Sequence, residues 1–166
     1  MALFISIPVL YIATLFQMVA ISRLPLIRGS ADLVMLVLVA WGIIDSGKNY
    51  WGWGLVGGLI MSFVTKVPWP AIILSYVLVT FIAHLMQRRI WQSPILAMLL
   101  MALLGTLVTQ FSAIFALSLN DVPLIIGECF SSVMVPSIIL NLILSVPVYI
   151  VINDIAKWVY PGIDHD

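Results

Sequence analysis

The segment ADLVMLVLVAWGIIDSGKNYWGWGLVGGLIMSFVTKVPWP, residues 31–70, decides how the rest of the chain is interpreted, because it is strongly apolar and yet repeatedly interrupted. Asp32 stands directly before an apolar run, a polar turn follows at 45–49, and the returning run carries glycine at positions 52, 54, 57 and 58. Glycine lowers helix stability, so such a cluster is typical of a helix to which another backbone comes close. We therefore expect a helical hairpin whose second arm is closely packed, with the other spans around it.

The composition of the whole chain is that of a polytopic membrane protein. Of its 166 residues, 63% are hydrophobic and 8% are charged, and the mean hydropathy is +1.21. A soluble domain of this size needs far more polar surface. The formal net charge of zero offers no basic field for nucleic acid, and the single Cys129 excludes both an internal disulfide and a multi-cysteine metal site.

Apolar runs and the breakers between them predict an all-α bundle of about six transmembrane helices, which forms a single domain over residues 1–166. The first run is interpreted as a retained span and not as a signal peptide, since no basic residue precedes it and Arg23 follows it. The second and third spans are short, either as two crossings, which we favour, or as a re-entrant hairpin. The expected spans are 3–22, 31–45, 50–65, 71–87, 94–119 and 124–152.

Details at the ends of the spans complete this topology. Trp51, Trp53 and Trp69 are expected in the interfacial belts at the two ends of the third span. Pro136 and Pro147 are expected to kink the long sixth span. With six spans, four of the seven Lys and Arg residues lie on the side of the termini, so the positive-inside rule places both termini in the cytoplasm by one charge.

Acidic residues inside a membrane protein are candidates for function, because ionising them there is costly. Asp32 precedes the second span, where it either caps the helix or makes a functional polar contact. Glu128 lies deeper, in the sixth span, and either binds a cation or an amine or sits at the interface with water.

Uncharged polar residues form a second pattern. Ser137, Asn141 and Ser145 follow one another at a spacing of four residues, which puts them on one face of the sixth span. Such residues hold membrane helices together by modest hydrogen bonds. On the fifth span, the residues expected to face them are Thr106, Thr109 and Gln110.

Catalytic motifs are lacking in the sequence. It contains no HExxH, no phosphate-binding glycine loop followed by Lys-Ser/Thr, and no suggestive grouping of serine, histidine and acid. We therefore expect a protein that is not an enzyme, with no cofactor and no metal site.

A further set of features runs along the chain: Gln17, the entry to the second span at 31–36, the glycine-rich run at 52–59, Pro68, Tyr76 and the pair Arg88-Arg89. Together these features resemble the MreD family, the small integral membrane subunit of the bacterial rod-shape (elongation) machinery. The resemblance covers most of the chain in length and span order. One departure is that the family often has an aspartate shortly after the glycine-rich segment, where this chain has Ser62 and Thr65.

The resemblance implies a non-enzymatic scaffold in the bacterial cytoplasmic (inner) membrane. Such a protein binds MreC, a single-span protein, and links cytoplasmic MreB filaments to RodA and a class B penicillin-binding protein, which build peptidoglycan. On this reading Gly54, Gly57 and Gly58 provide close helix packing, either within this chain or against a span of the partner. Asp32 caps a helix or makes a polar contact near the partner, and Arg88 and Arg89 contact cytoplasmic components or lipid phosphates. The substitutions Gly54→Leu and Gly58→Leu should then block partner association and leave membrane insertion intact.

The alternative is the substrate-binding subunit (S-component) of an energy-coupling-factor vitamin importer, a fold to which the MreD family is itself similar. This function needs a pocket that opens to the outside of the cell. The residues expected to line that pocket are Trp69, Asp121 and Glu128.

Overall fold

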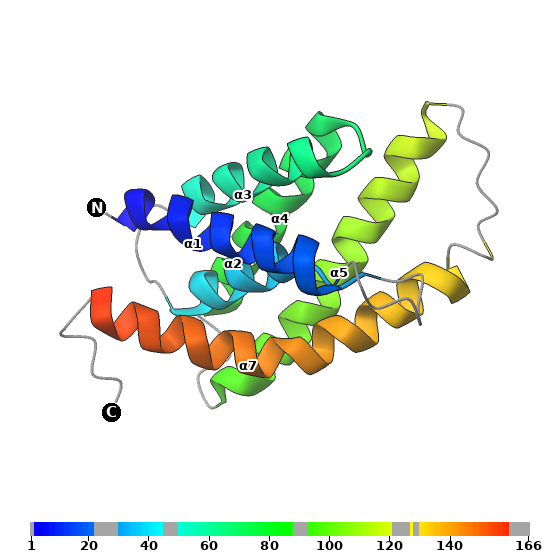
Figure 1. Ribbon diagram of the computed structural model, residues 1–166. Coiled ribbons are helices and arrows are strands. Elements are labelled where there is room, and N and C mark those ends of the chain that lie inside the picture. Colours follow the sequence, from blue (N-terminus) through cyan, green and yellow to red (C-terminus); the bar gives the residue numbers. More distant parts are fainter. Residues whose placement is uncertain are drawn as a thin grey trace.

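The computed structural model describes residues 2–21, 30–44, 50–87, 93–120, 127 and 130–159. The elements in this part of the chain are six α-helices and two π-helical turns, with no strand (Figure 1). The all-α prediction is therefore confirmed for the described residues. The elements are α1 (Ala2–Phe16), η1 (Gln17–Ile21), α2 (Leu33–Ile44), α3 (Tyr50–Val64), α4 (Trp69–Gln87), α5 (Pro94–Ser118), η2 (Phe130–Met134) and α7 (Val135–Val159).

Three of the helical segments are long and apolar enough to cross a membrane, namely Trp69–Gln87, Pro94–Ser118 and Phe130–Trp158. Three shorter apolar helices accompany them, at Ser6–Val19, Leu33–Ile44 and Trp51–Val64. The membrane-protein class is thus supported by length and composition, while six full crossings remain a prediction. A 12-residue helix such as α2 is about 18 Å long against a hydrocarbon core of about 30 Å.

The short helix α2 lies at the centre of the bundle. Every one of its residues except Ile43 is buried, and it contacts α1, α3, α4, α5 and α7. The expected hairpin of α2 and α3 therefore needs a correction. The principal partner of α3 is α4, which follows it after a short turn, and α2 is the arm that the other helices surround (Figure 1).

The chain runs back and forth, so that the start of α1 and the end of α7 lie at the same end of the bundle, on the left of Figure 1. The ends of α1 and α3 and the starts of α4 and η2 lie toward the opposite end. This arrangement agrees with an even number of passes through the bundle.

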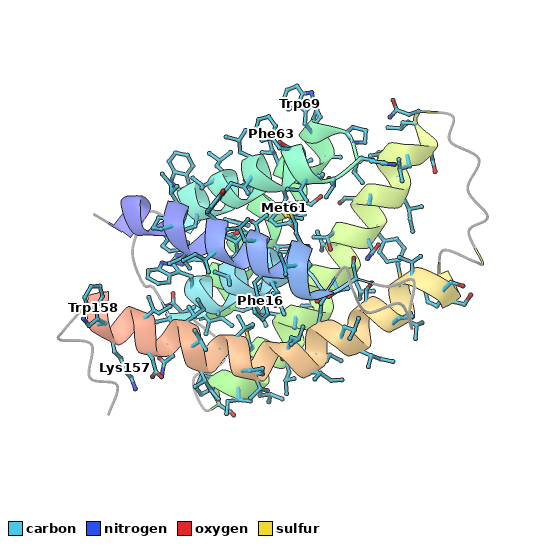
Figure 2. The ribbon with its side chains drawn as sticks, viewed as in Figure 1. Phe16, Met61, Phe63, Trp69, Lys157 and Trp158 are labelled. Carbon is cyan, nitrogen blue, oxygen red and sulfur yellow. The ribbon has the colours of Figure 1, made fainter. Side chains whose placement is uncertain are left out.

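The last helix ends later than the predicted 152, since α7 continues to Val159. Its first turn follows the π-helical turn η2, and Pro136 stands immediately after that junction. Proline lacks the N–H that an α-helix uses, so a wider turn beside it has a physical cause. Lys157 and Trp158 occupy the final turn and are exposed, the latter at 83% (Figure 2).

One of the predicted interfacial tryptophans is not at the surface. Trp53 is completely buried and stacks on Trp41, with ring centroids 4.1 Å apart and an interplanar angle of 19°. Trp51 and Trp69 are exposed, and Trp69 projects away from the bundle beside Phe63 in Figure 2. The prediction was wrong for Trp53 because stacking on a partner in α2 competes with the interfacial preference of tryptophan.

Candidate functional site

Asp32 caps the buried helix α2. Its Oδ1 accepts a hydrogen bond of 3.0 Å from the backbone N–H of Met35, and its own carbonyl accepts the first helical bond from Leu36 at 3.1 Å. This is the geometry of an N-cap, in which a short polar side chain takes one of the free N–H groups of the first turn. The capping alternative of the sequence analysis is therefore confirmed.

Other side chains satisfy the remaining backbone groups around this helix end. Val34 N–H donates to Gln17 Oε1 at 3.3 Å, and Asp32 N–H donates to Asn141 Oδ1 at 2.8 Å. Ser30 N–H donates to Ser137 Oγ at 3.2 Å. A helix that begins in the interior of a bundle needs acceptors for these groups from other parts of the chain, and η1 and α7 supply them.

The same residues are tied to α4 and α5. The Tyr76 hydroxyl donates to Asp32 Oδ2 at 2.6 Å, and Asn141 Nδ2 donates to Thr106 Oγ1 at 2.8 Å. Thr106 in turn donates to the carbonyl of Ala102. The prediction that Asn141 faces Thr106 is confirmed. We call this set of hydrogen-bonded side chains the polar cluster, and its members are Gln17, Asp32, Tyr76, Thr106, Ser137 and Asn141.

The polar cluster lies deep along the helices that form it. Thr106 is near the middle of the 25-residue helix α5, and Ser137, Asn141 and Thr106 are each no more than 1% exposed. Asp32 itself is only partly buried. The cluster therefore joins five segments of the chain in the interior of the bundle, with one side open toward a cavity.

That cavity has a volume of about 210 Å³ and lies between η1, the start of α2, the turn from α3 to α4, and parts of α4, α5 and α7. This is well above the ~10–15 Å³ that one water needs. Nine of the fourteen described residues that line it are polar, and Asp32 is the only charged residue among them. Met61 belongs to its apolar part and lies inside the bundle (Figure 2).

The glycine-rich helix α3 uses its glycines for contacts within the chain. A Cβ on Gly54 would lie 3.0 Å from Val77 Cα, and one on Gly58 would lie 2.8 Å from Ile73 Cα, so the backbones of α3 and α4 touch at both positions. A Cβ on Gly57 would lie 2.8 Å from Leu38 Cδ1 of α2. All three glycines are buried, which leaves them no exposed surface for a partner helix. The expectation of close packing is confirmed within the chain, where the neighbours are α4 and α2.

Of the other predicted site residues, Trp69 is the one that the structure describes. Trp69 is 67% exposed and does not line it. Arg88, Arg89, Asp121 and Glu128 lie outside the described residues. Within the described ranges no group of three or more His, Cys, Asp or Glu residues is placed to hold a metal ion.

Sequence reasoning missed how the site is assembled. Gln17 and Tyr76 were singled out only through the family resemblance, and Thr65 only because it stands near the position of an expected acid. All three line the cavity. A tyrosine in the middle of an apolar run is the one local signal, since its hydroxyl needs a partner when it is buried.

Comparison with known proteins gives no family for this chain: no family model, no curated protein and no solved structure matches it.

Proposed function

We propose that this chain is a non-enzymatic integral membrane scaffold subunit of the bacterial cell-elongation complex. In this role it binds MreC and links MreB filaments to RodA and the class B penicillin-binding protein. The proposal rests on the resemblance to the MreD family, and its location is the bacterial inner membrane with both termini in the cytoplasm.

The observation that supports the proposal is that three of the residues on which the resemblance rests lie close together in the structure. Gln17, Asp32 and Tyr76 come from η1, the start of α2 and α4, and they lie around one helix end. Tyr76 is 44 residues from Asp32 in the chain and donates its hydroxyl hydrogen directly to that carboxyl group. Features that are scattered in the sequence and joined in space support a shared structural unit more strongly than separate motifs do.

The packing of α3 restricts where a partner can bind. Since Gly54, Gly57 and Gly58 are buried against α4 and α2, the proposed MreC contact has to use an exposed surface of the bundle. Arg88 and Arg89 remain the proposed contact for cytoplasmic components or lipid phosphates, because Arg side chains suit both carboxylates and phosphates.

The proposal is tested by purifying the tagged full-length chain from its native membrane in a mild detergent and identifying the retained proteins by mass spectrometry. We expect MreC in stoichiometric amount, together with the two synthases. The double variant Arg88→Ala/Arg89→Ala should retain MreC and lose MreB. Recovery of ATPase subunits in place of MreC would contradict the scaffold function.

A second candidate function, the substrate-binding subunit of a vitamin importer, is favoured by the cavity. The cavity lies toward the end of the bundle opposite to the start of α1 and the end of α7, so with cytoplasmic termini it would lie toward the outside. Its lining differs from the one expected for this function, because Trp69 is not part of it. The same purification separates the two functions, since an importer subunit should carry a bound vitamin.

A further inference from the structure

We propose that the cavity beside the polar cluster binds a small ligand through a primary ammonium group, with the Asp32 carboxylate as the counter-ion. This site is independent of the scaffold function, which needs no ligand. The proposal rests on the charge of the cavity, on its unused hydrogen-bond acceptors and on its apolar wall.

The described part of the cavity lining carries the charge of one carboxylate. Among the described residues that line the cavity, Asp32 is the only charged one, and Lys66, in the turn beside it, is exposed and not part of the lining. The two side-chain oxygens of Asp32 accept from Met35 N–H and from the Tyr76 hydroxyl, and neither donor carries a charge. A carboxylate has about four acceptor positions, so each oxygen retains capacity for a further donor. A carboxylate inside a membrane bundle is costly unless a cation accompanies it.

Further acceptors line the same cavity. Thr65 Oγ1 is buried and has no hydrogen-bond partner, although a buried hydroxyl without one is unfavourable. The side chain of Gln110 also lines the cavity and makes no hydrogen bond with another described residue. A primary ammonium group carries three donors and no acceptor, which matches a carboxylate, a hydroxyl and an amide carbonyl.

The remaining wall limits what the ammonium group is attached to. Met61, Val67 and Ile72 provide apolar surface, and the volume of about 210 Å³ fits a short chain and not a large ring system. Two sources carry this chemistry, a free small amine and the headgroup of an ethanolamine lipid. A trimethylated ammonium group has no N–H to donate and should bind poorly.

The test uses the full-length chain in phosphatidylcholine nanodiscs at pH 7, with n-propylamine as the soluble probe and propanol and propionate as neutral and anionic controls. The readout is the midpoint of thermal unfolding as a function of probe concentration, because a ligand that binds only the folded state raises it. A parallel series replaces phosphatidylcholine stepwise by phosphatidylethanolamine.

We expect a saturable rise of the midpoint with propylamine, with phosphatidylethanolamine, or with both, and none with propanol or propionate. A response to propylamine alone identifies a free amine as the ligand, and a response to the lipid alone identifies the headgroup. Asp32→Asn keeps an N-capping side chain but removes the charge, so it should weaken binding by about tenfold or more. The matched control Asp154→Asn changes an exposed acid on α7 and should bind as the unmodified chain does.

The proposal is overturned if neither series shows a saturable response, if propanol acts as well as propylamine, or if Asp32→Asn binds unchanged. Should Asp32→Asn fail to fold, Thr65→Val decides the question. This near-isosteric change removes one proposed acceptor, so it should weaken binding, and unchanged binding would overturn the proposal.

Discussion

The amino end of α2 and the contact between α3 and α4 join helices inside the same bundle by opposite means. At the amino end of α2, side chains from η1, α4, α5 and α7 bridge the space between the helices with directed hydrogen bonds. Between α3 and α4, by contrast, Gly54 and Gly58 let the two backbones touch. The contact at the amino end of α2 depends on hydrogen bonds between specific polar atoms. The contact between α3 and α4 depends on the space that the missing side chains of Gly54 and Gly58 leave free.

This difference predicts which substitutions the bundle tolerates without a large loss of stability. A hydrogen bond between membrane helices contributes modestly, about 0.6 kcal/mol on average, so one lost bond leaves the fold in place. A backbone contact has no side chain that can move aside, so an added atom must separate the helices. Changes of shape between α3 and α4 should therefore cost more than changes of polarity around α2.

The largest effect is expected for Gly58→Leu. Its Cβ alone would lie 2.8 Å from Ile73 Cα, so α3 must move away from α4. We expect a loss of about 3 kcal/mol or more in the free energy of unfolding, at the upper end of measured overpacking costs. A loss of partner association in this variant would then result from the separation of α3 and α4 inside the bundle. The change in the free energy of unfolding is measured by unfolding the two proteins in mixed bicelles.

The matched control for this substitution is Gly127→Leu. Among the residues that the structure describes, none has an atom within 4 Å of a Cβ built on Gly127, so the same change should cost little there. If Gly58→Leu were as stable as Gly127→Leu, the close approach of α3 and α4 would be refuted.

A smaller effect is expected for Asn141→Leu in the polar cluster. The substitution conserves approximate volume but leaves Asp32 N–H without its acceptor and Thr106 Oγ1 without its donor. We expect a loss of about 1–3 kcal/mol, the cost of unsatisfied buried polar groups. The same unfolding assay on Thr106→Val and on the double variant gives the coupling energy, and a value of zero would argue against the bond between Asn141 and Thr106.

Loss of the Asp32 cap of α2 should lower the free energy of unfolding by less than Asn141→Leu does. Asp32→Ala removes the acceptor of Met35 N–H and of the Tyr76 hydroxyl, and we expect a loss of about 1 kcal/mol, as is typical for a helix cap. Asp32→Asn keeps a capping oxygen and should lose only part of this. Equal losses for the two variants would mean that the negative charge, and not the cap, stabilises α2.

Much of the fold could be predicted because breakers mark the helix ends locally. The predicted spans 50–65, 71–87 and 94–119 differ by no more than two residues from α3, α4 and α5, which end or begin beside polar residues and prolines such as Pro68 and Pro94. The cap was predictable for the same reason, since an acid before an apolar run is a local signal.

The assembly of the site could not be predicted, because its contacts join distant positions. Asp32 and Asn141 are 109 residues apart and Asp32 and Tyr76 are 44 residues apart, and no periodicity in the sequence connects them. The central position of α2 and the burial of Trp53 depend on which helices become neighbours. A uniformly apolar helix does not reveal that choice, since lipid and another helix are equally apolar surroundings.

Gly57→Ala is expected to have the smallest effect, and it separates the two kinds of close approach within α3 itself. Its Cβ would lie 2.8 Å from Leu38 Cδ1, the movable end of a side chain, whereas at Gly58 the obstacle is the backbone of Ile73. Replacing glycine by alanine inside a helix gains about 0.5–1 kcal/mol in propensity, which offsets a small shift of Leu38. We expect a net change within about 0.5 kcal/mol for Gly57→Ala and a clear loss for Gly58→Ala in the same unfolding assay, because adjacent glycines in one helix differ only in what they face. Equal losses at the two positions would mean that α2 packs against α3 as rigidly as α4 does.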